Sequence, residues 1–432
     1  MKLTAPISKI VVVLAVLACL ASPGSAQKAP RQEKLLNGLK VLMWPDQTAS
    51  GVTVRIRVHS GSAFDPQGKE GVMYLLARNV FPTEAAREFF REDLGGNVEV
   101  VSNYDYIQIN AESNPASLIA MLDTLAQVVS NPTIDKETTD SLKAELLSEL
   151  ELREKDPAYV ADQAAAKRLF GKFPYGRPEM GTKESVSKID FAELIFAKSR
   201  FFGADNAAVT VRGKFDPDLA YRAIRRYFGA WLKSDKRVPP TFEQPADPPA
   251  EMLTISTELT GQRQVRVAIR GYAKGSKDLA AADVLAHVLN DRLKATLSPR
   301  EVTRSFVRHE GHVLPGFFLF GYESGPAQIG SARAEPDAAA GTDVIARLFA
   351  KPITELEFTE GRSAAMSALD SRGFDESWLD ADTYGISPAG GERKSLESLT
   401  LADVQRVAGE ISKRPAAKVM VDARPAAQTN SN

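Results

Sequence analysis

The most informative segment of the chain is Gly61-Ser62-Ala63-Phe64-Asp65-Pro66-Gln67-Gly68-Lys69-Glu70-Gly71-Val72-Met73-Tyr74-Leu75-Leu76-Ala77-Arg78-Asn79-Val80-Phe81. The residues before it, 52–58, alternate apolar and polar side chains, which predicts a strand with one buried face. After Gly61, its first half contains Asp65-Pro66, Gly68 and Gly71, which are typical of a turn. Its second half places apolar residues at helical spacing from Val72 to Val80, which predicts a buried helix. We therefore expect a strand, a turn and a helix in succession.

The start of the chain is typical of an export signal. Lysines precede an apolar run from Ile10 to Leu20, and small residues lead to a cleavage site after Ala26. We expect residues 1–26 to be removed and the mature protein to reside in the periplasm. The apolar run has about half of the ~20 residues that a spanning helix needs, so we expect no integral membrane span. Cys19 leaves one alternative, a lipoprotein anchored through that cysteine.

The composition is that of ordinary globular domains. Of 432 residues, 44% are apolar and 25% are charged, and the formal net charge is -1. This balance gives no electrostatic reason to expect a nucleic-acid partner. Cys19 is the one cysteine, so the exported chain would be held together by its cores and not by disulfides. A chain of this length exceeds one usual core, so we expect it to split into domains.

A proline-rich segment, residues 237–250, divides the chain. Its prolines are Pro239, Pro240, Pro245, Pro248 and Pro249. Proline cannot donate to a strand ladder and favours an extended, semi-rigid connection, so this segment is a linker in our interpretation. We expect an N-terminal domain at 27–236, a C-terminal domain at 251–424 and a disordered tail at 425–432.

The two halves look like repeats of one unit. Residues 52–58 and the apolar helix after them are echoed by residues 264–270 and the helix at 281–289. A predicted helix over residues 185–194, which leads to a strand, is mirrored by residues 395–404. Each half alternates short strands with longer helices and ends on a strand. We predict an α+β fold of two repeated domains, each a mostly antiparallel sheet packed against helices.

The segment from Gly61 to Phe81 resembles its counterpart in the insulinase/pitrilysin-type zinc peptidases, the inverzincins, to which mitochondrial processing peptidase is similar. In that family a strand ending in Gly-Ser leads to a Gly-x-x-His-Leu-Leu-Glu-His helix. Further landmarks follow in family order over nearly all of the mature chain: residues 95–100, 104–106, 173–178, 181–182 and 213–217. The resemblance implies the same two-domain architecture.

The positions of the family's metal helix are altered in this chain. The resemblance implies two histidine ligands four residues apart and a glutamate base, and these positions hold Tyr74, Arg78 and Ala77. Alanine has no proton to move, and a guanidinium is always positive and repels a dication. The family's third ligand corresponds to Glu149, for which we expect solvation or an ion pair with Arg78. We therefore predict no catalytic residue, metal or cofactor in this chain, with zinc expected only in a catalytic partner.

The resemblance also implies a substrate-binding edge. In the family, an extended peptide adds as a strand beside the segment that corresponds to residues 97–106, which includes Val98 and Val100. An Arg and a Tyr in the family's second half help to hold the peptide. The matching positions here are Arg300 and Phe306, although the motif around them matches poorly. A local structural role is the alternative for both residues.

Other metal sites can be checked one by one, because only four histidines occur. His59 lies at a predicted strand end and His287 on an apolar helix face, where a core or hydrogen-bonded role is the usual one. His309 and His312 are three residues apart, but neighbouring glycine and proline favour a turn and not a helix. We expect no zinc site there.

Two classes of function fit these observations. The first is the non-catalytic subunit of a periplasmic heterodimeric zinc peptidase, which binds extended peptide and completes the chamber of an active partner of the same family. The second is a freestanding peptide-binding or scaffold protein of the cell envelope. A neighbouring gene with an intact His-x-x-Glu-His helix favours the first class, and its absence favours the second. A third reading, an active peptidase with atypical ligands, requires metal in the purified protein.

Overall fold

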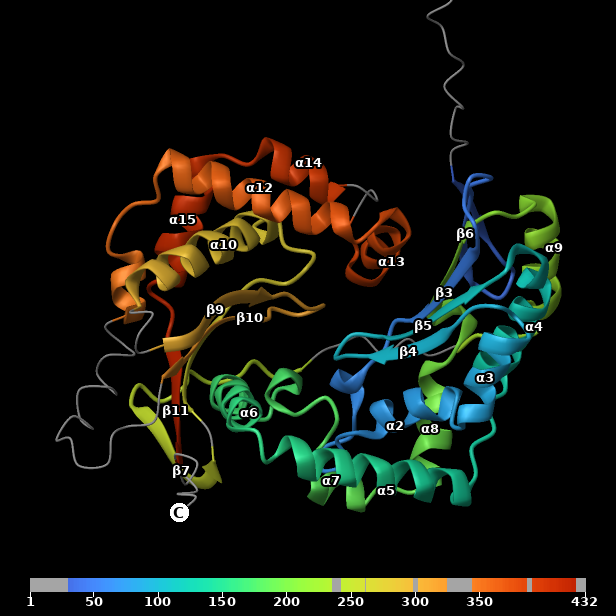
Figure 1. Ribbon diagram of the computed structural model, residues 1–432, viewed down its shortest axis with the longest axis horizontal. Coiled ribbons are helices and arrows are strands. Elements are labelled where there is room, and N and C mark those ends of the chain that lie inside the picture. Colours follow the sequence, from blue (N-terminus) through green and yellow to red (C-terminus); the bar gives the residue numbers. More distant parts are fainter. Residues whose placement is uncertain are drawn as a thin grey trace, which may run out of the picture.

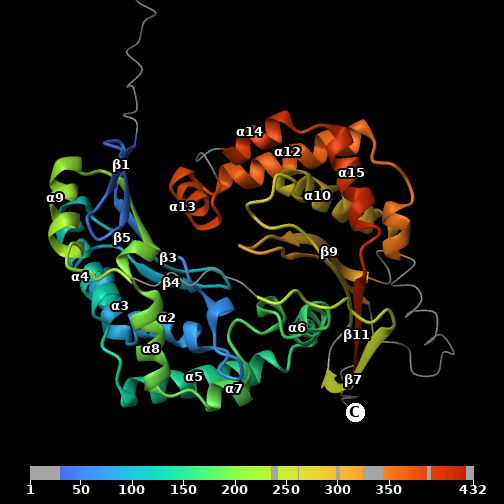
Figure 2. The same ribbon diagram turned by 180° about the vertical axis from the view of Figure 1, so that it is seen from behind.

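Two sheets form, one in each half of the chain, and helices cover both (Figures 1 and 2). The computed structural model describes residues 30–234, 242–260, 262–297, 302–324, 344–386 and 391–424. Residues 1–26, the tail 425–432 and Arg300 lie outside the described residues. The prediction of an α+β fold with two mostly antiparallel sheets packed against helices is confirmed.

The first sheet has six strands in the order β1-β2-β6-β3-β5-β4, and only β2 and β6 pair in parallel. Its strands are β1 (Arg31–Lys34), β2 (Lys40–Pro45), β3 (Val52–Val58), β4 (Val98–Ser102), β5 (Ile107–Ser113) and β6 (Ala207–Gly213). The helices of this half are α2 (Val72–Val80), α3 (Glu84–Glu92), α4 (Leu118–Ser130), α5 (Lys136–Arg153), α6 (Pro157–Phe170), α7 (Lys183–Ser187), α8 (Phe191–Phe201) and α9 (Pro217–Phe228). The predicted strand and helix around residues 52–80 are both present.

The second sheet has five described strands in the order β7-β11-β8-β10-β9, and only β7 and β11 pair in parallel. Its strands are β7 (Met252–Thr260), β8 (Arg263–Arg270), β9 (Val302–Glu310), β10 (Phe317–Ser324) and β11 (Ala416–Arg424). The longer helices of this half are α10 (Leu279–Thr296), α12 (Glu355–Ser371), α13 (Phe374–Tyr384), α14 (Gly391–Ser398) and α15 (Leu401–Ile411).

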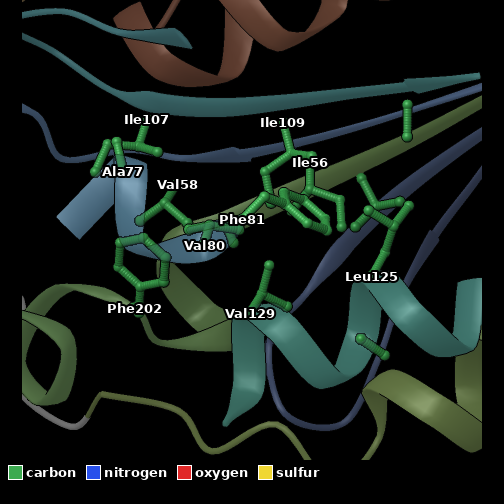
Figure 3. Close-up of a cluster of buried hydrophobic side chains, with 14 of the residues drawn as sticks. Ile56, Val58, Ala77, Val80, Phe81, Ile107, Ile109, Leu125, Val129 and Phe202 are labelled. Carbon is green, nitrogen blue, oxygen red and sulfur yellow. The ribbon is translucent and has the colours of Figure 1, made fainter. Parts of the chain in front are cut away.

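The alternation in β3 builds the first core. Its four apolar side chains are at most 2% exposed: Val52, Val54, Ile56 and Val58. They pack against the apolar faces of α2 and α4, and burial of each such side chain contributes about 1.5–3 kcal/mol. Figure 3 shows part of this core, with side chains from α2, α4, β3 and β5: Ala77, Val80, Leu125, Val129, Ile56, Val58, Ile107 and Ile109.

The two halves exchange one helix each. Helix α6 of the first half lies on the second sheet, where Ala161, Ala165 and Leu169 join a buried cluster with residues of β8, β10 and β11 (Figure 1). Helix α13 of the second half lies against the first sheet, where Trp378 and Leu379 pack on β2 and β6. The proline-rich segment separates the two sheets in the sequence, but α6 and α13 each pack on the sheet of the other half.

The helices predicted over residues 185–194 and 395–404 are each two helices and not one. The carboxylate of Asp190 caps α8 by accepting a hydrogen bond from the amide of Ala192. The carboxylate of Glu193 in turn accepts a hydrogen bond from the amide of Asp190. Thr400 and Asp403 make the corresponding box at the start of α15. A capping residue inside an apolar helical pattern starts a new helix, and apolar periodicity alone does not show this start.

Residues 242–250 of the predicted linker form no helix or strand. Phe242 packs there, with its ring centre 6.0 Å from that of Phe173 and 6.4 Å from that of Phe64. Among the helices of the described ranges, none combines the length and the apolar character that crossing a bilayer requires.

Candidate functional site

The turn before α2 fixes the start of this helix. The carboxylate of Asp65 accepts hydrogen bonds from the amides of Gly71 and Met73, at 2.7 Å and 2.8 Å. Gly71 has φ of 105°, a left-handed conformation, and a Cβ there would lie 2.8 Å from the carbonyl oxygen of Met180. Burial raises the pKa of the Asp65 carboxyl to about 7, while the two amides and Arg177 act in the opposite direction. This turn therefore sets which side chains of α2 face α5.

Of the four predicted positions of the altered metal site, Tyr74, Arg78 and Glu149 lie together between α2 and α5. Arg78 forms an ion pair with Glu149, and Nη2 of Arg78 lies 3.4 Å from the hydroxyl of Tyr74. The guanidinium also lies over the Tyr74 ring, 5.1 Å from its centre. Arg153, one turn along α5, donates to the same carboxylate at 3.0 Å. Ala77 is buried against the first core.

This arrangement does not fit a zinc ion. Two guanidinium groups, from Arg78 and Arg153, already hold the one carboxylate that could bind metal, and both stay charged at ordinary pH. Zinc needs three or four thiolate, imidazole or carboxylate ligands. Within the ranges that the structure describes, no group of three or more His, Cys, Asp or Glu side chains is arranged to bind a metal.

Strand β4 forms one edge of the first sheet. It pairs with β5, with Val98 opposite Ala111 and Val100 opposite Ile109. Val98 is buried and Val100 packs on the first core, whereas Glu99 on the other face is exposed. Helix α2 contacts β4, so this edge runs beside the helix that carries Tyr74 and Arg78 (Figures 1 and 2). The edge leaves backbone groups available to a further strand.

Phe306 lies within β9, opposite Gly321 of β10. A Cβ on Gly321 would lie 2.3 Å from the ring of Phe306, so the ring covers the glycine directly. The guanidinium groups of Arg266 and Arg308 each lie 5.1 Å from the ring centre. These contacts give Phe306 a local packing role in the sheet.

Three of the four histidines lie within hydrogen-bond distance of a carboxylate. His309 Nδ1 is 2.8 Å from Asp283, His312 Nδ1 is 3.0 Å from Asp105, and His59 Nε2 is 2.9 Å from Asp382. His309 lies next to the last residue of β9, Glu310, and His312 lies in the following loop, where the neighbouring glycine and proline predicted a turn. His287 and His309 both line a cavity in the second half.

The sequence interpretation missed two polar clusters that join the halves. In one, Asp105 accepts from His312 and from the amide of Val313, at 3.0 Å and 3.2 Å. In the other, the polar face of β3 meets the acidic face of α13, and the pairs are Arg55 with Asp375, Arg57 with Glu376 and Asp380, and His59 with Asp382. The signal was present, because Arg55, Arg57 and His59 alternate along β3 and α13 carries carboxylates at helical spacing.

Solved structures share this fold. A protease from Helicobacter pylori superposes with a TM-score of 0.81 at 17% identity, over 92% of this chain and 99% of that chain. A peptidase M16 inactive domain from Pseudomonas fluorescens gives 0.80 at 19% identity, over 93% and 99%. The periplasmic protease PqqL from Escherichia coli gives 0.69 at 15% identity, over 91% of this chain and 47% of that chain. The fold is therefore that of M16-like peptidases.

The sequence matches the same family directly. Residues 40–183 match the model of the insulinase family, peptidase family M16, and residues 188–364 match that of the peptidase M16 inactive domain. This chain belongs to the M16 peptidase family. An uncharacterized zinc protease of Mycobacterium bovis is 25% identical over 283 residues, and one of Bacillus subtilis, YmxG, is 22% identical over 266 residues. These alignments cover 64% and 60% of this chain, and the chain spans 64% of the length of each relative.

Proposed function

We propose that this protein is an exported, non-catalytic M16 subunit that binds extended peptide and completes the chamber of an active partner of the same family. The observation that carries the proposal is the ion pair between Arg78 and Glu149, which occupies the positions where the family resemblance implies metal ligands. An arginine at a ligand position excludes the metal by charge, and Ala77 at the base position moves no proton. Peptide cleavage then requires another chain.

The edge strand supports the peptide-binding part of the proposal. Pairing along β4 uses main-chain groups, so the loss of the metal leaves it unaffected. Val98 and Val100 face the core, while their own backbone groups remain on the edge, because Asn97 beside them exchanges its bonds with Glu112 of β5. Each net hydrogen bond contributes only about 0.5–1.5 kcal/mol, so short peptides bind weakly and with broad sequence preference.

The build of a structural relative is consistent with a second unit. The residues described here superpose on 47% of PqqL, and the rest of PqqL is a further part that they do not match. In this proposal two such units enclose the chamber, and this protein supplies the unit without metal. The other unit comes from a chain with an intact His-x-x-Glu-His helix.

Export is part of the same proposal. PqqL is described as periplasmic, and the first 26 residues of this chain read as a removable signal. Cleavage after Ala26 leaves Gln27 at the mature N-terminus, which the intact mass of the envelope-fraction protein measures. Palmitate labelling that depends on Cys19 would instead identify a lipoprotein.

The partner is tested by co-expression. The chain is expressed with and without an M16 peptidase of the same organism that has the intact motif, and peptide cleavage and size-exclusion profiles are compared. We expect the two chains to elute together and the mixture to cleave a long peptide faster than the motif-bearing chain alone. Equal cleavage by that chain alone, with separate elution, contradicts the partner and favours the freestanding scaffold.

The peptide edge is tested with backbone-modified peptides. A peptide with N-methyl groups on alternate amides keeps its side chains but loses the donors and the space that strand pairing requires. We expect the complex to bind the methylated peptide more weakly by at least about tenfold, since several hydrogen bonds are lost together. Equal affinity for both peptides places the binding outside β4.

A further inference from the structure

The second half contains a cavity of about 620 Å³. Its walls come from three elements: α10, the edge strand β9 and α12, which lie together in Figure 1. The loop at residues 274–277 and the start of α14 complete the lining. Cavities of about 300–1,000 Å³ with mixed apolar and polar walls are the usual size for small organic ligands.

This cavity occupies the place that corresponds to the altered metal site of the first half. Over nine residues, α2 from Val72 and α10 from Ala281 share one order of buried and half-buried positions. In this register, the positions of Tyr74, Ala77 and Arg78 are taken by three residues that all line the cavity: Asp283, Ala286 and His287. The same three kinds of element, a buried helix, an edge strand and a long second helix, enclose both places.

The two places differ in what fills them. In the first half, the long side chains of Arg78 and Glu149 meet between α2 and α5. In the second half, α12 contributes Ala365, Ala368 and Leu369 to the wall, and two of these side chains are single methyl groups. The space that an ion pair fills in one half is therefore an open cavity in the other.

The polar groups of the cavity favour an anion. Four lysine or arginine side chains and two acidic ones line it, and both acidic groups are already bound: Asp283 to His309 at 2.8 Å and Glu392 to Arg372 at 3.0 Å. Three of the basic groups also pair with carboxylates, namely Lys274, Arg308 and Arg372, so the fourth, Lys277, is the one that can pair with a ligand. His309 is itself satisfied, because its Nε2 accepts from the amide of Tyr272 at 3.2 Å.

Two side chains that line this cavity have hydrogen-bond donors without a partner among the described residues. Within the described part of the chain, neither the ring of His287 nor the ammonium group of Lys277 has a hydrogen bond or ion pair. Lys277 is exposed and His287 is half-buried, so they lie at different depths of the cavity wall.

We propose that this cavity binds a ligand with an apolar body and one carboxylate. The body packs on Leu279, Ala286 and Leu369, and the carboxylate accepts from Lys277 and His287. Two sources have this chemistry, a free aliphatic acid and the carboxyl terminus of a peptide with apolar last residues. The site lies apart from the β4 edge, so the outcome of its test does not depend on whether the proposed partner exists.

The proposal is tested by calorimetric titration of the mature protein with four probes. These are decanoate, decanol, the tripeptide Ala-Leu-Leu with a free carboxylate, and the same tripeptide as its amide. We expect one site per chain and binding of decanoate or of the free tripeptide that is at least about tenfold tighter than that of its neutral counterpart. Binding of decanoate alone identifies an aliphatic acid as the source, and binding of the tripeptide alone identifies a peptide terminus.

Variants locate the site. Lys277→Glu changes an exposed side chain and is expected to weaken binding at least about tenfold, while Ala368→Trp fills the cavity from its exposed rim and abolishes binding. Lys394→Glu is the matched control, because this exposed lysine of α14 does not line the cavity. No binding of either acid, equal binding of acid and neutral probe, or full binding by Ala368→Trp would overturn the proposal.

Discussion

Nη1 of Arg57 lies 2.7 Å from Oδ1 of Asp380, and this contact joins strand β3 of the first half to helix α13 of the second. The Arg57 side chain is fully buried, its Nη2 pairs with Glu376, and its Nε donates to Gln108 at 2.6 Å. The centre of the Tyr106 ring lies 3.9 Å from Cζ of the guanidinium. A charge so placed is tolerated only while its partners remain, because its desolvation is otherwise uncompensated. The interlock of the two halves therefore depends on buried ion pairs as well as on apolar packing.

Removal of one partner tests this interlock. Asp380→Ala is expected to lower the free energy of unfolding by about 3–5 kcal/mol, since it removes one of the two carboxylates that pair with the buried Arg57. Chemical denaturation measures the change. Glu84→Ala is the control, because Glu84 pairs with Arg91 on the exposed surface of α3 and its loss is expected to have no measurable effect. Equal effects of the two variants would contradict the account of the interlock.

The half-buried carboxyl of Glu179 predicts how stability varies with pH. Burial raises the pKa of Glu179 from 4.5 to about 7, partly opposed by His312, while Glu310 and Asp105 also raise it. Folded protein thus holds this proton more tightly than unfolded protein. Its stabilisation is fully present below pH 4.5 and is lost as the pH rises to about 7, by up to about 3 kcal/mol.

Glu179→Gln isolates this contribution. The variant keeps a neutral side chain at every pH, so its free energy of unfolding should match that of the unchanged protein at pH 4.5 and exceed it above pH 7. Denaturation curves across this range give the difference. Burial also raises the pKa of Asp65 to about 7, so Asp65 makes the free energy of unfolding fall with rising pH by the same amount in both proteins. Parallel curves for the two proteins would show that Glu179 does not titrate in this range.

The turn before α2 allows a paired glycine test. Gly71→Ala places a Cβ at a left-handed φ and 2.8 Å from the carbonyl oxygen of Met180, so we expect a loss of more than about 1 kcal/mol. Gly409→Ala in helix α15 meets no atom within 4 Å and is expected to stabilise the protein by up to about 1 kcal/mol. Thermal unfolding measures both. Destabilisation by both variants alike would argue against the geometry of the turn.

The metal positions are tested by rebuilding them. The triple variant Tyr74→His, Ala77→Glu and Arg78→His supplies two ligands and a base and releases Glu149 from Arg78, which leaves Glu149 paired only with the exposed Arg153, so we expect it to bind zinc. Tyr74→His alone should bind none, because Arg78 still holds the carboxylate. Glu149→Ala added to the triple variant should remove the zinc again. Zinc bound equally by the single and triple variants would show that the metal lies elsewhere.

Local patterns in the sequence predicted most of the fold. The period of two in β3 and the helical spacing after Gly71 each reflect one buried face, and both elements formed where expected. The resemblance brought Tyr74, Arg78 and Glu149 together, and the structure shows the ion pair. The exchange of α6 and α13 was not predicted, because contacts between distant segments leave no local periodicity; Asp162 and Arg266 are 104 residues apart, and Arg57 and Asp380 are 323 apart. His287 was assigned a core or hydrogen-bonded role because one helix face alone does not show the cavity beside it.

The zinc content of the mature chain, purified without an affinity tag, tests the central claim most directly. Mass spectrometry of metals and a peptidase assay with and without a chelator are applied to the same sample. We predict no stoichiometric zinc and no chelator-sensitive cleavage, because Arg78 and Arg153 hold Glu149 and the base position is Ala77. One zinc per chain together with cleavage that a chelator abolishes would contradict the assignment of this protein as a non-catalytic subunit.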